Sequence, residues 1–313
     1  MRNLKIRKLI PLLVTVIILV GFGYYLYVNI DQYLHLLSVS PGSILELLVF
    51  SLAMTLVNSI QNTYVYRGVG IANFSHRDSY LITSASTLIN QLPIPGGIIS
   101  RAYYLKRKHN LSYTKFTSST LALFFCLLSV SGLIGICALL YISCSAGIKP
   151  QPVLLISFIG MMCSILIFWV PLHKLPLPTR LRAGFLQAIE GWQTIGQTPS
   201  LLLIMILLQI TMVFFLSLRY LVAFRMVSQN VSLGQTLLFA SATVLTQLVS
   251  IAPGGLGVRE AIVAAVASII GFDPVVSVVA VSLDRLVLTT IIVITGWISS
   301  IYLGKEIQAE VIE

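Results

Sequence analysis

Long apolar stretches alternate with short polar ones along most of the chain. A helix needs about 20 mostly apolar residues to cross the roughly 30 Å hydrocarbon core of a bilayer. Six stretches reach or approach that length and are predicted to span the membrane: residues 9–30, 43–66, 116–143, 152–170, 201–224 and 274–302. The pattern predicts an all-α polytopic membrane protein that forms a single transmembrane domain over residues 1–313.

Two further apolar regions are interrupted where a spanning helix would have to continue. Residues 79–92 make a helix only about 21 Å long, and residues 235–251 are separated from residues 258–272 by a glycine-rich segment. Because proline removes a backbone donor and glycine relaxes the backbone, each region is predicted to be a broken, re-entrant helical hairpin. Two short tilted helices are the alternative for the first region. The predicted helix-breaking residues are Pro95, Gly96, Gly97, Pro253, Gly254, Gly255 and Gly257.

The two interrupted regions resemble each other. One constant shift aligns Ser75 with Ser232, together with several residues that follow each, and one more residue of shift aligns Pro95 with Pro253. The second shift also aligns Arg67 with Arg225 and Arg101 with Arg259. Chance similarity between apolar segments is the alternative. The alignment predicts two repeats, residues 43–143 and 201–303, in opposite orientations, as in transporters that bind substrate near the bilayer midplane.

Basic residues indicate the orientation of the chain. They precede the first predicted span and recur at Lys106, Arg107 and Lys108 and at Arg180 and Arg182. Because cytoplasmic loops carry an excess of lysine and arginine, both termini are predicted to lie in the cytoplasm. Residues 172–200 are polar with apolar residues at helical spacing, which predicts an amphipathic cytoplasmic linker between the repeats.

Composition narrows the class of function. The chain is 57% hydrophobic and 10% charged, which excludes a soluble domain of 313 residues. The net charge of +10 comes without a basic, aromatic-interleaved segment, so we expect no nucleic-acid partner. The four cysteines match no metal-site spacing, and no catalytic triad, Walker sequence or metal-ligand cluster is found. We therefore expect no cofactor, no metal and no catalytic residue.

Polar residues inside the apolar segments indicate a binding site. Arg101, Arg259 and Arg285 lie in or beside such segments. Arginine presents a planar fork that suits phosphate and carboxylate, and half-helix N-termini at the breaks would add positive potential. These features predict an anion site whose natural ligand is a phosphate-bearing lipid. The alternative is neutral ion pairing, because Glu260 follows Arg259 and Asp284 precedes Arg285.

Amide side chains extend this candidate site. Asn58, Gln61 and Asn62 fall at i, i+3 and i+4 on one helix face, which must look into the protein or a cavity. Hydrogen bonding between helices is the alternative role for these amides. The candidate substrate-binding residues are Arg101, Arg259, Glu260, Asp284, Arg285, Asn90, Gln91, Gln247, Asn58 and Gln61.

The sequence Pro253-Gly254-Gly255-Leu256-Gly257-Val258-Arg259-Glu260, with Arg285, resembles the signature of the lysylphosphatidylglycerol synthase transmembrane-region family. This flippase-like domain also forms the N-terminal part of multiple peptide resistance factors. The resemblance extends over about residues 9–302. It implies an inner-membrane protein with about eight membrane segments that moves a polar lipid between leaflets, or that serves a lipid-modifying enzyme.

Two departures from the family pattern qualify what the resemblance implies. Family members often carry an Arg and a Gly-Glu where this chain has Gly97-Ile98-Ile99-Ser100. The chain also shows no soluble synthase domain after the last span, so aminoacylation of lipid is not expected. The alternative to a translocase is a membrane enzyme, or an enzyme subunit, that acts on polyprenyl-phosphate or phospholipid. A structural protein whose arginines only hold the fold is a third hypothesis.

Overall fold

A computed structural model describes residues 40–91, 96–146, 150–168, 198–247 and 257–312, together with Tyr24 and Tyr27. Within these residues the secondary structure is helical, without a strand. The first predicted span, residues 9–30, lies outside the described residues except for those two tyrosines. Residues 172–197, which make up nearly all of the predicted linker, also lie outside them.

Four long helices are each apolar enough to cross a membrane: α3 (Pro41–Gly68), α6 (Tyr113–Ala146), α9 (Pro199–Met226) and α12 (Pro274–Ile312). Proline stands in the first turn of α3 and α9, where its missing N–H is not needed by the helix. Four of the predicted spans are thereby confirmed. At the expected position of a further span lie a shorter apolar helix, α7 (Pro152–Cys163), and the 3₁₀ turn η1 (Ser164–Phe168).

Both interrupted regions are broken into separate helices, as predicted. The first contains α4 (His76–Ile89) and α5 (Gly96–His109). The second contains α10 (Leu233–Thr243), the 3₁₀ turn η3 (Val244–Gln247) and α11 (Val258–Ile269). Gly96 and Gly97 begin α5, and Gly257 caps α11 at φ +79°, a backbone conformation that favours glycine. The other predicted breaking residues, Pro95, Pro253, Gly254 and Gly255, lie outside the described residues.

The two hairpins begin in the same way. The Ser75 hydroxyl accepts a hydrogen bond from the Asp78 amide at 2.9 Å, and the Ser232 hydroxyl accepts one from the Gln235 amide at 3.3 Å. Ser75 and Ser232 are aligned by the sequence repeat, and each caps the N-terminus of its helix. The next turn also corresponds. Ser79 donates to the carbonyl of α3 residue Ser59, and its counterpart Thr236 contacts the Ser217 hydroxyl of α9.

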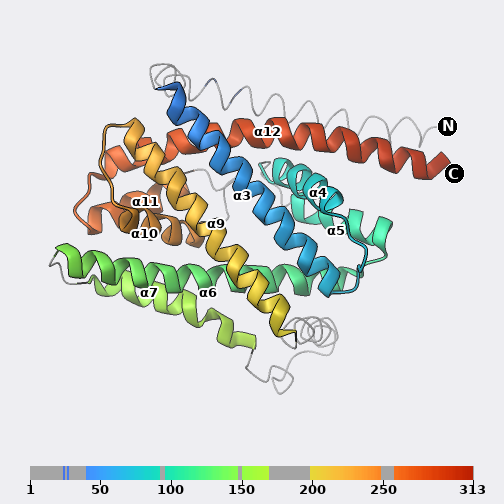
Figure 1. The fold of residues 1–313 in the computed structure, drawn as a ribbon, viewed down its shortest axis with the longest axis horizontal. Coiled ribbons are helices and arrows are strands. Elements are labelled where there is room, and N and C mark those ends of the chain that lie inside the picture. Colours follow the sequence, from blue (N-terminus) through green and yellow to red (C-terminus); the bar gives the residue numbers. More distant parts are fainter. Residues whose placement is uncertain are drawn as a thin grey trace.

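Helices α3 and α9 pack side by side along their length and run in opposite directions (Figure 1). Helices α6 and α12 each pack against α9 and also run in opposite directions (Figure 1). Helix α4 packs on α12, whereas α10 packs on α6, so the first helix of each hairpin lies against the last long helix of the other half. Superposition of residues 43–143 on 201–303 stays a prediction.

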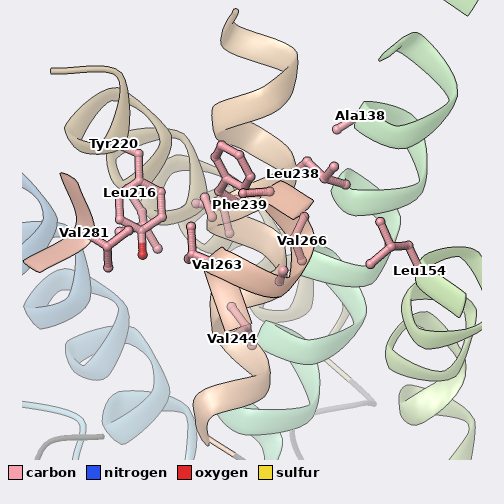
Figure 2. Close-up of a cluster of buried hydrophobic side chains, with 14 of the residues drawn as sticks. Ala138, Leu154, Leu216, Tyr220, Leu238, Phe239, Val244, Val263, Val266 and Val281 are labelled. Atoms are coloured by element: carbon pink, nitrogen blue, oxygen red, sulfur yellow. The ribbon is translucent and has the colours of Figure 1, made fainter. Parts of the chain in front are cut away.

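The largest buried apolar cluster holds the second hairpin in place. Side chains from α10 and α11, including Phe239, Val263 and Val266, pack against α6, α7, α9 and α12 (Figure 2). Phe224 of α9 stacks on Phe239 with ring centroids 5.3 Å apart. This packing holds α11 next to α9 and α12. These two helices carry charged side chains that face the start of α11.

Candidate functional site

A buried ion pair joins α9 to α12. Arg219 donates from Nε to Asp284 Oδ1 at 2.9 Å and from Nη2 to Asp284 Oδ2 at 2.7 Å. Both side chains are 1% exposed. The remaining Arg219 nitrogen, Nη1, lies 3.6 Å from the Met54 sulfur of α3. Arg219 thus ties three helices together at a depth where an unpaired charge would be costly.

A second ion pair joins α11 to α12. Arg285 Nη1 donates to both carboxylate oxygens of Glu260, at 2.9 Å and 3.1 Å. The side chains are 6% and 12% exposed, so this pair is nearly as buried as the first. It holds the first turn of α11 against the middle of the last long helix.

Arg259 is paired more loosely than the other two arginines. Its Nε donates to the Tyr220 hydroxyl at 2.9 Å, and its Nη1 lies 4.0 Å from Asp284 Oδ2, an oxygen that already accepts from Arg219. The Tyr220 hydroxyl contacts the Thr243 hydroxyl at 3.0 Å, and Thr243 in turn donates to the Phe239 carbonyl. Since Thr243 uses its proton on that carbonyl, Tyr220 donates to Thr243 and accepts from Arg259. The chain of hydrogen bonds orients the guanidinium, and its terminal amino groups form no hydrogen bond with the residues that the structure describes.

The charges of this cluster do not cancel. It contains three guanidinium groups, of Arg219, Arg259 and Arg285, and two carboxylates, of Asp284 and Glu260. One positive charge is therefore in excess, and the geometry assigns it to Arg259, the most exposed of the five at 16%. Arg259 is the second residue of α11 and follows a glycine cap, where the helix dipole adds positive potential. The arrangement favours an anion.

The ion pairs differ from those expected from sequence neighbours. The neutral-pair hypothesis matched Arg259 with Glu260 and Asp284 with Arg285, and it is wrong for these partners. Adjacent residues of a helix point about 100° apart and do not face each other. Glu260 instead meets Arg285, and Asp284 meets Arg219. Arg219 itself was missed. The sequence alignment could have identified it. The shift that aligns Arg67 with Arg225 also aligns Arg219 with Gln61, a residue of the polar face of α3.

Arg101 belongs to a separate cluster in the first hairpin. Its Nε and Nη2 both donate to the Ser86 hydroxyl, at 3.1 Å and 2.7 Å. Ser86 is aligned with Thr243, but Arg101 contacts Ser86 directly, whereas Arg259 is linked to Thr243 through the Tyr220 hydroxyl. The structure does not bring Arg101 into contact with the charged cluster of the second half.

Several predicted amides have internal partners. Gln61 is buried and donates to the Met205 carbonyl of α9 at 3.1 Å, and Asn62 donates to Asn58 and to Thr83 of α4. These contacts match the alternative role of hydrogen bonding between helices. Asn90 accepts from the Gly97 amide at 3.0 Å and so closes the first hairpin. Gln91 is partly buried next to that turn, and Gln247 is exposed at the end of η3.

The two halves carry different chemistry at equivalent places. Arg219 and Tyr220 of α9 correspond to Gln61 and Asn62 of α3, and Glu260 corresponds to Ala102. Helix α6 contains no acid and no arginine, whereas α12 supplies Asp284 and Arg285. Among the described residues, the charged groups of this site therefore all come from the second half. Within the part of the chain that the structure describes, no group of three or more His, Cys, Asp or Glu side chains is placed to hold a metal ion.

Comparison with known protein families identifies the family of the chain. The family described as "Lysylphosphatidylglycerol synthase TM region" matches residues 9–296, which include every residue of the charged cluster. The match confirms the family suggested by the glycine-rich motif. No curated protein and no solved structure matches the chain.

Proposed function

Because the chain belongs to the lysylphosphatidylglycerol synthase transmembrane-region family, a family of multi-pass membrane proteins with a lipid-related role, we propose that it moves an anionic lipid between leaflets. The lipid bears a phosphate in its headgroup. The observation that carries the proposal is the unbalanced Arg259 of the second hairpin, set beside a glycine-rich break.

Three features of Arg259 support phosphate binding. Its terminal amino groups form no hydrogen bond within the described residues, so the bidentate edge of the guanidinium is available to two phosphate oxygens. Its charge exceeds what the two carboxylates of the cluster neutralise. Tyr220 holds its Nε, which reduces the rotational freedom that ligand binding would otherwise remove.

Transport is proposed in preference to chemical modification of the lipid. Both carboxylates of the cluster are engaged in ion pairs, so neither is placed as a free general base. An inverted arrangement of two hairpin-bearing halves is the architecture through which many transporters alternate access. The sequence shows no ATP site, so movement would be downhill or ion-coupled.

The test uses purified protein in vesicles of phosphatidylcholine doped with fluorescent phosphatidylglycerol. Transfer of the probe between leaflets is measured by chemical quenching from outside. Arg259→Lys keeps the charge but loses the planar fork, so transfer should fall sharply, and Arg259→Gln should abolish it. Both variants should keep the wild-type melting temperature to within a few degrees.

The matched control is Arg225→Gln, because Arg225 forms an exposed ion pair with Glu46 outside the charged cluster. This variant should transfer lipid at the wild-type rate. Recovered lipid is analysed by mass spectrometry, and a covalently altered headgroup would support the enzyme alternative. A folded Arg259→Gln protein with full transfer would overturn the proposal.

A further inference from the structure

An apolar groove lies between α5 and the start of α6, outside the charged cluster. It has a volume of about 300 Å³ and is lined by Ile98, Ile99, Ala102, Tyr103, Tyr113 and Phe116. Ile99 is 63% exposed and Ile98 49% exposed, so this face of α5 has no protein partner within the described residues. In a membrane protein such a face meets lipid chains.

Basic side chains stand at the mouth of the groove. Lys106 Nζ lies 4.3 Å from the ring centroid of Tyr113, and Arg107 Nη1 donates to the Tyr103 hydroxyl at 3.1 Å. Both tyrosines line the groove, so the two cations are held at its rim by the residues that form its walls. Tyrosine concentrates at the membrane interface, which places this rim at the level of lipid headgroups.

The corresponding position in the second half is closed. Helix α11 packs closely on α12, whereas α5 makes only a few contacts with α6. Ala102, which lines the groove, corresponds to Glu260, and Glu260 is bound to Arg285 of α12. An open groove is therefore not a necessary result of the hairpin architecture. It distinguishes one half from the other in this conformation.

We infer that the α5–α6 groove docks an anionic phospholipid from the leaflet beside the basic cluster. One acyl chain occupies the groove, and the phosphate lies between Lys106 and Arg107. By the positive-inside rule this leaflet is the cytoplasmic one. An acyl chain gains little free energy by moving from the bilayer into an apolar groove. The preference for an anionic lipid must therefore come from the two cations. The inference deepens the proposed function, because it names where the lipid enters.

The experiment uses phosphatidylglycerol with a photoactivatable group in one acyl chain, in phosphatidylcholine vesicles that contain the full-length protein. Cross-linked positions are mapped by mass spectrometry. Labelling is expected at residues 98–103 and 113–117, and unlabelled phosphatidylglycerol should compete while added phosphatidylcholine should not. Lys106→Gln and Arg107→Gln should each reduce the preference for the anionic lipid about fivefold.

Two controls separate this site from ordinary lipid contact. Lys305→Gln removes an exposed basic side chain from α12 and should leave the labelling unchanged. Ile99→Trp fills the groove and should suppress labelling there, whereas Ile156→Trp, at a position 69% exposed on α7, should not. Equal labelling by a photoactivatable phosphatidylcholine would show that the groove holds bulk lipid, and the inference would be overturned.

The outcome is distinguishable from failure of the proposed function. Arg259→Gln should lose transfer but keep groove labelling, because Arg259 is in the other hairpin. If groove labelling is absent while Arg259→Gln still abolishes transfer, the docking site is wrong and the proposed function stands. If labelling is present but Arg259→Gln transfers normally, the docking site stands alone.

Discussion

Arg219 and Asp284 form two parallel hydrogen bonds, at 2.9 Å and 2.7 Å, between helices whose side chains at this point are almost fully buried. The same carboxylate also lies near Arg259, with 4.0 Å between Asp284 Oδ2 and Arg259 Nη1, so Asp284 interacts with two arginines. A change at Asp284 therefore affects two arginines, whereas a change at Arg219 affects one carboxylate that still has a second cation nearby.

The first prediction follows from that asymmetry. Asp284→Asn leaves Arg219 without its counter-charge and should destabilise the protein by about 3–5 kcal/mol, the usual cost of breaking a buried pair. Arg219→Gln should cost less, because Arg259 can approach Asp284 from 4.0 Å. The double variant should recover part of the loss. Melting temperatures in detergent check this, and an Asp284→Asn protein as stable as wild type would contradict it.

The second prediction concerns the pair that holds α11 on α12. A double-mutant cycle with Glu260→Gln and Arg285→Gln should give a coupling energy of about 1–3 kcal/mol. The matched pair is Glu46 with Arg225, whose side chains are 44% and 54% exposed and whose coupling should stay below about 1 kcal/mol. Unfolding of all variants in the same detergent gives both values. Equal coupling for the two pairs would be inconsistent with the burial seen here.

The third prediction tests the hydrogen-bond chain behind Arg259. Tyr220→Phe removes the hydroxyl that accepts from Arg259 and donates to Thr243, so it should cost about 1–3 kcal/mol for the partners left unsatisfied. Lipid transfer should fall as well, since the guanidinium loses its orientation. Tyr141→Phe, at a residue 63% exposed on α6, is the control and should change neither property.

The fourth prediction compares two glycines that both have room for a side chain but differ in backbone conformation. A Cβ at Gly257 or at Gly160 would meet no atom of the described residues within 4 Å, but of these two glycines only Gly257 has a positive φ, +79°. Gly257→Ala should destabilise the protein by about 1–2 kcal/mol. Gly160→Ala, inside α7, should stabilise it by up to about 1 kcal/mol. Thermal unfolding of both variants is the measurement, and the same sign for both would refute the assignment of the cap.

The fifth prediction concerns Lys108, where α5 meets the end of α12. Lys108 Nζ lies 3.0 Å from Glu306, 3.7 Å from Asp78 and 3.1 Å from the Tyr104 hydroxyl. Burial alone would lower the pKa of Lys108, but the hydrogen bonds to Tyr104 and Glu306 and the nearby Asp78 raise it above its ordinary value. Its stabilising contribution is thus fully present below the ordinary lysine pKa of about 10.4 and is lost as pH rises through the higher folded-state pKa.

Lys108→Gln should accordingly lower the melting temperature by a constant amount between about pH 7 and pH 9, and the difference from wild type should shrink well above the ordinary lysine pKa. Lys305→Gln, with no such partners within the described residues, should show no difference at any pH. A Lys108→Gln deficit that grows with rising pH would contradict the expected sign.

The sequence predicted four membrane spans and the division of both interrupted regions into separate helices because these are local properties. A run of apolar residues in 201–224 must be helical in lipid to satisfy its own backbone, whatever surrounds it. A serine at position 75 or 232 caps a helix through the amide three residues later, again within one turn. The aligned residues Ser79 and Thr236 also make similar contacts, one with Ser59 of α3 and the other with Ser217 of α9.

The partners of the charged residues were decided only by the tertiary structure. Asp284 and Arg285 are neighbours in the chain, but the helix turns their side chains toward different helices, one to α9 and the other to α11. Which cation remains in excess therefore depends on how α9, α11 and α12 pack, and not on the order of the residues. The sequence could place an arginine beside a glycine-rich break. Only the packing of the helices determines that, among three arginines and two acids, Arg259 is the arginine whose charge is not neutralised by a close carboxylate.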